Sequence, residues 1–248
     1  MALDFSDARV KLSRARKHIS DVDAAIAVFL EADLHRLTIE AKQGRREVTL
    51  ESLPHPKKDI NAVIGDAVGN LRSTLDYIAV ALVAHSNCPT DEVGFPFAQD
   101  DKGFFGTVTK GSLSVVPLVH QHFVTEIQAY QGGRGHTLWV LNKLRNIDKH
   151  RFLVATVQIT GAAVSFQAGG NLFRGVTFKM PAGEKRSLVY GADVSEAHFA
   201  NQPNPTFEVR FAEPPLIQGE GVVDFLNGAA GQIEGLLDPL EKLFPSAA

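Results

Sequence analysis

The amino-acid sequence predicts an α+β fold with a helical N-terminal part, a later antiparallel β-sheet and a C-terminal helix. As far as residue 151, apolar residues recur mainly at three- and four-residue steps, which is the period of an amphipathic helix. From Phe152 onward apolar and polar residues alternate, as they do in strands, and after Gly221 the helical period returns. With 248 residues, 44% of them apolar, the chain is long enough to bury a substantial core.

Two long helices and a hairpin are expected in the first third of the chain. The helices span Asp4 to His35 and Asp59 to about His85, because each range carries an unbroken apolar stripe. Between them, Arg36 to Glu40 and Glu47 to Glu51 alternate around Gln43-Gly44, which is typical of a β-hairpin. An isolated hairpin is marginally stable at best, so we expect this one to pair with later strands.

The middle of the chain is predicted to alternate loops with shorter helices. An aromatic, proline-punctuated loop surrounds Gly94-Phe-Pro-Phe97. Pro117 is expected to open a helix that runs to Tyr130, because proline suits the first helical turn. Thr137 is a good N-cap for another helix, which should end near His150.

The last third is predicted to hold short strands and one closing helix. The strands are expected at Val154 to Thr160, Ala162 to Phe166, Val176 to Lys179, Ser187 to Tyr190 and Thr206 to Phe211. The helix should run from Gly221 to Phe244. The chain thus divides into a mainly helical part (1–151, with a hairpin near 36–51), an antiparallel β part (152–212) and a closing helix (213–248), or forms one compact α+β unit.

The net charge of −3 is a cancellation between zones of opposite sign. Arg9 to His18 and Arg134 to Arg151 are basic, whereas the chain after Glu213 is acidic. The near-neutral total argues against a protein that coats nucleic acid, but it leaves room for one small basic site. We expect the acidic closing helix to cover or tune the basic surfaces.

Cysteine content and hydropathy predict a cytoplasmic protein. A lone thiol, Cys88, cannot form an internal disulfide, and a reducing compartment suits it. No apolar run approaches the roughly 20 residues of a membrane helix, so no membrane partner is expected. His122 and Glu126 share a helix face, but two ligands without a third make a poor metal site, and no metal or other cofactor is predicted.

The most informative stretch is Arg145-Asn-Ile-Asp-Lys-His150, in which four residues separate an arginine from a histidine. It resembles the Arg-x(4 to 6)-His motif of the HEPN superfamily, helical proteins that include many metal-independent endoribonucleases. The resemblance implies that His150 acts as general acid/base on the ribose 2′-hydroxyl and that Arg145 holds the phosphate, with Asn146 orienting one of them. It also implies an RNA substrate and a homodimer.

Further binding residues extend this hypothesis. Lys149 and Arg151 enlarge the basic surface beside the motif, and Arg72 and Asp76 lie on the long helix expected to face it. A protein partner is a further expectation.

A second resemblance covers about the first 155 residues. Its blocks are Gly65-Asp-Ala-Val-Gly-Asn-Leu-Arg-Ser-Thr-Leu-Asp-Tyr77, Phe95-Pro-Phe97, Leu138-Trp139 and Asn146-Ile-Asp-Lys-His-Arg151. They are similar to those of a family of uncharacterised bacterial proteins. The resemblance implies a bacterial cytosolic protein and carries no activity with it.

Two alternatives to the ribonuclease remain open. On an ideal helix His150 lies about 140° from Arg145, and Arg145 and Asp148 fall on the apolar side. This placement favours a non-enzymatic, HEPN-like binding or interaction module, in which Arg72, Asp76 and Asp148 form a structural ion-pair network. The other alternative is a small-molecule enzyme with an aromatic pocket wall made of Phe95, Phe97, Phe104 and Phe105.

Overall fold

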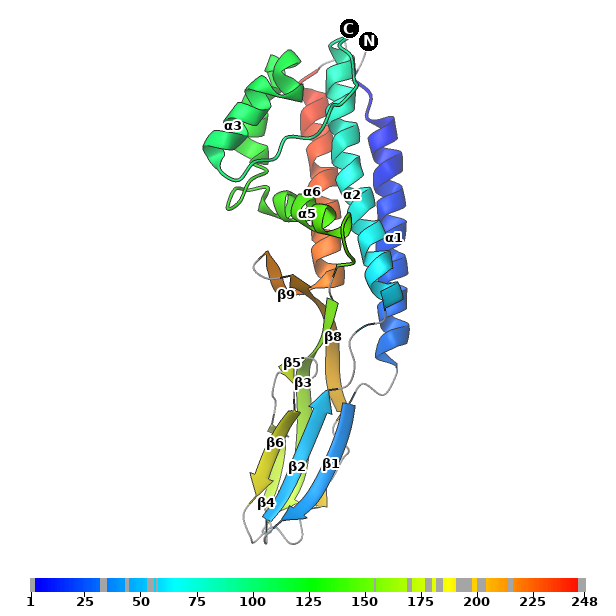
Figure 1. The fold of residues 1–248 in the computed structure, drawn as a ribbon, viewed down its shortest axis with the longest axis vertical. Helices are drawn as coiled ribbons and strands as arrows, with labels where there is room; N and C mark the ends of the chain where they lie inside the picture. Colours follow the sequence, from blue (N-terminus) through cyan, green and yellow to red (C-terminus); the bar gives the residue numbers. More distant parts are fainter. Residues whose placement is uncertain are drawn as a thin grey trace.

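Helices gather at one end of the molecule and strands at the other (Figure 1). This computed structural model describes residues 3–31, 35–42, 45–52, 56, 58–153, 155–168, 171–176, 180–181, 185–190, 198–199, 204–213 and 216–244. α1 begins and α6 ends at the helical end, far from the strands (Figure 1). The predicted α+β class is confirmed.

The three longest helices, α1, α2 and α6, lie side by side along the long axis, and α5 crosses α2 and α6 (Figure 1). The helical segments are α1 (Ser6–Leu30), α2 (Lys58–His85), α3 (Asp101–Lys110), η1 (Ser112–Val115), α4 (Pro117–His122), the π-helical turn η2 (Phe123–Ile127), α5 (His136–Asp148) and α6 (Val222–Lys242). Among the described residues, no helix has both the length and the apolarity needed to cross a bilayer.

The long helices form because their apolar residues fall on one face. In α1 the buried side chains follow each other at steps of three or four residues: Ala8, Leu12, Ala15, Ile19, Val22 and Ile26. α2 and α6 repeat this pattern with larger aliphatic residues, and all three stripes meet in one core. Burial of apolar area, at roughly 25 cal/mol per Å², is the main force that holds the helices together.

Helix boundaries in the middle of the chain differ from those predicted. α3 occupies residues that carry no long apolar stripe, and it begins because Asp100 caps it: the Gly103 N–H donates to Oδ1 at 2.7 Å. The helix that opens at Pro117 was expected to reach Tyr130, which is wrong. It stops at His122, continues as the π-helical turn and ends where Gln128 adopts a left-handed backbone (φ 48°).

The predicted N-cap of α5 is also wrong, because Gly135, not Thr137, precedes the helix. A Cβ at position 135 would collide with the Ile127 carbonyl oxygen, so only glycine fits where the loop passes this close. At the other end of the helical part, α1 stops at Leu30, five residues before the expected His35, and β1 already begins at His35.

The strands form two antiparallel sheets. One has the order β1 (His35–Lys42), β2 (Arg45–Ser52) and β6 (Lys185–Tyr190). The other has the order β4 (Asn171–Val176), β3 (Ala155–Ala168), β8 (Asn204–Glu213) and β9 (Ile217–Gly221), with β5 (Met180–Pro181) and β7 (His198–Phe199) also on β3. The predicted pairing of the hairpin with a later strand is confirmed, because β2 pairs with β6.

One strand prediction needs correction. The two strands expected at residues 154–160 and 162–166 are a single strand, β3, whose pairing with β8 shifts register between Ile159 and Gly161. Such an irregularity lets one strand bend without ending, and a glycine next to it is typical. The strand expected at Val176 to Lys179 overlaps the end of β4, and its residues 177–179 lie outside the described residues.

The base of the larger sheet belongs to the same core as the helices. Val157 on β3 and Val209 and Phe211 on β8 are buried with the helical stripes, and the Phe211 ring meets that of Phe225 on α6 edge-on. β9 runs directly into α6 at Gly221. These contacts fix the position of β8 against the lower turns of α1 and α6.

Candidate functional site

α5 approaches α2 closely at two glycines, Gly65 and Gly69, one helical turn apart. The Asp148 carboxylate lies directly over Gly65, so closely that a Cβ there would overlap it. The Arg145 side chain lies over Gly69, where a Cβ would be 3.6 Å from Nε. The position of Asp148 therefore depends on the absence of a Cβ at Gly65, whereas a Cβ at Gly69 would meet Arg145 in ordinary van der Waals contact.

Arg72 and Asp76 on α2 form an ion pair, with Nη1 2.6 Å from Oδ2. Arg72 also donates from Nε to Asn142 Oδ1 on α5 at 2.8 Å, and its guanidinium carbon lies 4.7 Å from the centre of the Phe97 ring. Only 17% of the Arg72 side chain is exposed, so this cation is largely taken out of water and held by partners on three sides.

The other oxygen of Asp76 holds the aromatic loop. The Phe95 backbone N–H donates to Oδ1 at 3.0 Å, so one carboxylate connects α2 to the loop and, through Arg72, to α5. We define the set Arg72, Asp76, Asn142 and the Phe95 N–H as the α2 clamp. Arg72 and Asp76, both expected from the sequence to bind a ligand, form an ion pair with each other.

Asp148 does not join the α2 clamp, which corrects the predicted network. The charges that act on it are Arg145 and Asp66. Burial raises the pKa of its carboxyl group, the Arg145 guanidinium lowers it in part, and Asp66 raises it further. Asp148 is thus a half-buried acid whose charged form is disfavoured by its surroundings.

Arg145 is half-buried and lies over Gly69 of α2, and its guanidinium acts electrostatically on Asp148. In the part of the chain that the structure describes, Arg145 has no hydrogen bond and no ion pair within 4 Å. Asn146 is exposed. Lys149 caps the helix end, and His150 follows in a turn, where its N–H donates to the Ile147 carbonyl at 2.9 Å.

The structure does not join His150 to Arg145. His150 and Lys149 are exposed, whereas Arg145 lies along α2, and no hydrogen bond connects the histidine and the arginine among the described residues. Among the described residues, no hydrogen bond or ion pair thus links the two side chains that the ribonuclease hypothesis assigns to acid/base and phosphate-holding roles.

Arg151 is bound to the sheet. Its guanidinium donates to both oxygens of Glu213 at the end of β8, from Nη1 at 3.0 Å and from Nη2 at 2.6 Å. The Glu213 side chain is only 4% exposed, so this fork-shaped pair joins the exit of α5 to β8. Arg151 is not available as a free phosphate-binding cation in this arrangement.

The acidic closing helix covers part of the basic face of α1, as the charge distribution predicts. Arg9 Nη2 lies 2.9 Å from Glu241 Oε1 and 3.3 Å from Asp238 Oδ1, and Arg16 Nη2 lies 2.6 Å from Glu234 Oε2. Arg14 and Lys17 remain exposed on the outer side of α1. The basic run is thus partly neutralised within the fold.

The described residues that were considered for a metal site or for an aromatic pocket wall do not come together in such a site. Among the described residues no three His, Cys, Asp or Glu side chains are grouped to hold a metal ion. Glu126 accepts from Arg134 at 2.5 Å. Phe95 and Phe104 are buried in the core, whereas the Phe105 side chain is 55% exposed, so the predicted aromatic wall is split between the core and the surface.

Fold and site together define an α+β protein in which the α2 clamp connects α2, α5 and the Phe95 loop. In comparisons with models of protein families, with curated proteins and with solved structures, no match to the chain is found.

Sequence reasoning missed several partners of the predicted residues. Asn142 and Phe97 contact Arg72, and Glu213 contacts Arg151 from a position 62 residues further along the chain. Long-range pairs of this kind leave no local pattern. Gly65 is a usable signal, because a glycine within a long amphipathic helix is typical of a place where a neighbouring segment approaches the backbone closely.

Proposed function

We propose that this chain is a non-enzymatic binding module with a HEPN-like helical scaffold, in which the charged motif residues serve the structure. One observation carries the proposal: the Asp76 carboxylate is shared between Arg72 and the Phe95 N–H, so its charge connects three segments. Arg151 has a similar structural role, because it is paired with Glu213 on β8.

The cellular setting of the proposal comes from the sequence. Cys88 is a free, half-buried thiol, which suits the reducing cytoplasm of a bacterium. The resemblance of its sequence blocks to those of a bacterial protein family supports the same setting.

The second candidate is the HEPN-like, metal-independent endoribonuclease. Arg145 favours it, since its guanidinium has no hydrogen-bonding partner among the described residues and His150 and Asn146 are exposed nearby in the sequence. In this candidate a second copy of the chain, as a homodimer, supplies the group that each site lacks. Lys149 would then contact the RNA backbone.

Cleavage of RNA in the presence of EDTA separates the two candidates. The full chain is incubated with a labelled single-stranded RNA, alongside Arg145→Ala, His150→Ala and, as a matched surface control, Lys102→Ala. We expect equal and negligible cleavage by all four proteins. The opposite result is that Lys102→Ala retains cleavage, whereas Arg145→Ala and His150→Ala lose it with unchanged circular dichroism. This result would contradict the binding module and support the nuclease.

A further inference from the structure

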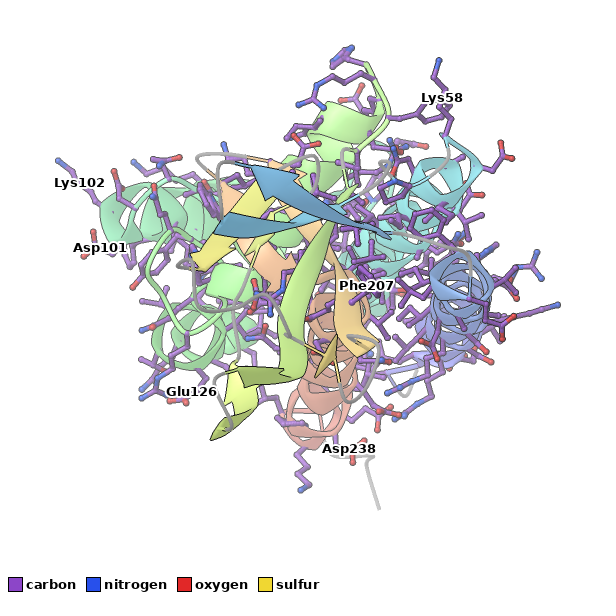
Figure 2. The ribbon with its side chains drawn as sticks, turned by 90° about the horizontal axis from the view of Figure 1, so that it is seen from below. Lys58, Asp101, Lys102, Glu126, Phe207 and Asp238 are labelled. Atoms are coloured by element: carbon purple, nitrogen blue, oxygen red, sulfur yellow. The ribbon has the colours of Figure 1, made fainter. Side chains whose placement is uncertain are left out.

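A cavity of about 320 Å³ lies where the larger sheet meets the helices. The last turns of α1 form one side, β8 forms another, and the first turn of α6 closes it. Figure 2 looks at the molecule from the strand end and shows Phe207 of β8 between its strand and the helices. The volume is at the lower limit of cavities that hold small molecules, which measure about 300–1,000 Å³.

The inner wall of the cavity is apolar. Ile26 and Leu30 come from α1, Phe207 and Val209 from β8, and Val222 from α6. Ile26, Val209 and Val222 are themselves buried, so they form a firm surface rather than a mobile one. Such a wall favours a ligand with an apolar body, because its burial removes apolar area from water.

Three carboxylates from three different elements line the same cavity: Asp23 of α1, Glu208 of β8 and Asp224 of α6. Glu208 is held in place, since Oε2 accepts from Arg210 Nη2 at 2.6 Å and from Nε at 3.0 Å. Its other oxygen lies against Gly221, where a Cβ would collide with it. The charge of Glu208 is therefore largely offset by Arg210.

Asp23 and Asp224 are not paired with a cation among the described residues. Both are exposed, and neither has a hydrogen bond or an ion pair among the described residues. Because Glu208 and Arg210 offset each other, these two carboxylates leave the lining of the cavity with an excess of negative charge.

The partial charges at the two helix ends beside the cavity also contribute to the electrostatic field there. The C-terminal end of α1, which carries partial negative charge, lines the cavity through Leu30, and its last turn holds no basic residue to offset that charge. The start of α6 carries partial positive charge, equivalent to about half an elementary charge, so it offsets only part of the negative charge of Asp224 in its first turn. The net field at the cavity therefore favours a cation.

We propose that this cavity binds a small organic cation, in which an ammonium or guanidinium group is attached to a short apolar body. The charged group lies between Asp23 and Asp224, and the apolar body lies against Phe207 and Val222. This inference rests on the proposed function, because it names the ligand class of the binding module.

Isothermal titration of the full chain with 2-phenylethylamine tests the proposal, with 2-phenylethanol as the neutral probe of nearly equal shape. We expect saturable binding of one amine per chain and binding of the alcohol weaker by about tenfold or more, as two nearby carboxylates predict. Equal binding of both probes overturns the proposal, and so does the lack of saturable amine binding up to about 10 mM.

Variants locate the binding. Asp23→Asn and Asp224→Asn should each weaken amine binding by about fivefold and leave alcohol binding unchanged. Asp91→Asn is the matched control, because it removes the same charge from an exposed loop outside the cavity. If the two cavity variants bind the amine like Asp91→Asn, the amine binds elsewhere and the proposal fails.

A variant that fills the cavity gives a measurement independent of charge. Val223, half-buried at the cavity, is replaced by tryptophan, and circular dichroism confirms the fold before titration. We expect loss of amine binding. Retained amine binding overturns the proposal. If the wild-type chain is a dimer that Val223→Trp dissociates, a second copy of the chain occupies the cavity, and the proposal is overturned as well. None of these results depends on RNA cleavage, so this inference and the proposed function fail separately.

Discussion

At the scale of single residues, the contact of α5 with α2 depends on what Gly65 lacks. The Asp148 carboxylate occupies the space that a Cβ at position 65 would need. An alanine would otherwise favour the helix by about 1 kcal/mol. The conflict between helix propensity and close approach makes this position a sensitive probe of the α2–α5 contact.

Gly65→Ala should lower the free energy of unfolding by about 1 kcal/mol, because the overlap with Asp148 exceeds the gain in helix propensity. Gly228→Ala is the control, since a Cβ at this position of α6 meets nothing within 4 Å, and it should raise the free energy by about 0.5–1 kcal/mol. Urea denaturation measures both. In the double variant Gly65→Ala/Asp148→Ala the overlap is absent, so stability should be recovered. Equal effects of Gly65→Ala and Gly228→Ala on the free energy of unfolding would contradict the close contact of Asp148 with Gly65.

The raised pKa of Asp148 gives a pH-dependent prediction. Because burial raises this pKa, the folded chain holds the proton more tightly than the unfolded chain, and the charged carboxylate destabilises the fold. The destabilisation is complete at neutral pH and disappears as the pH falls below about 4. Asp148→Asn should therefore be more stable than the wild type at neutral pH, and the difference should vanish in acid.

Thermal unfolding followed between neutral and acidic pH measures this difference, with Asp91→Asn as a control on an exposed loop. A stability difference that is independent of pH would show that the Asp148 charge is not the cause.

At the scale of elements, the basic face of α1 and the acidic face of α6 are bonded to each other. The pairs are exposed: 43% of the Arg16 side chain and 58% of the Glu234 side chain are accessible. Exposed pairs contribute little, typically about 0.2–1 kcal/mol each. They align two helices that apolar burial already holds together, so their effect on stability should be small but specific.

Arg16→Glu should destabilise the chain by about 1 kcal/mol or less, because it places like charges opposite each other. The double variant Arg16→Glu/Glu234→Arg should regain most of the loss, whereas Arg14→Glu on the outer side of α1 should not be rescued by Glu234→Arg. Denaturant titration at low and high salt gives the measurement, and the coupling should decrease with salt. Additive effects of the two single changes would contradict the pair.

At the scale of the whole molecule, the long elements could be predicted from the sequence and their mutual contacts could not. α2 and α6 follow from unbroken apolar stripes, and the hairpin from alternation around Gln43-Gly44. α3 lacks such a stripe, and β3 continues through a register shift that reads as a strand end. The fold class can thus be predicted from local sequence patterns, whereas the presence of α3 and the continuity of β3 depend on packing.

The candidate site shows the same limit. The sequence marked Arg72, Asp76 and Arg151 as important, and their partners Asn142, the Phe95 N–H and Glu213 lie 19 to 70 residues away from them. Charge pattern alone cannot distinguish residues that bind a ligand from residues that bind one another. That distinction needed the distances between side chains.

The most direct test of the α2 clamp is the free energy of unfolding of Asp76→Ala, measured by urea denaturation beside His150→Ala. Asp76→Ala leaves the largely buried Arg72 without its carboxylate and the Phe95 N–H without its acceptor, so we expect a loss of about 2–4 kcal/mol. His150→Ala, at an exposed position, should change the free energy by less than about 0.5 kcal/mol. An Asp76→Ala chain as stable as the wild type would contradict the structural role of the α2 clamp.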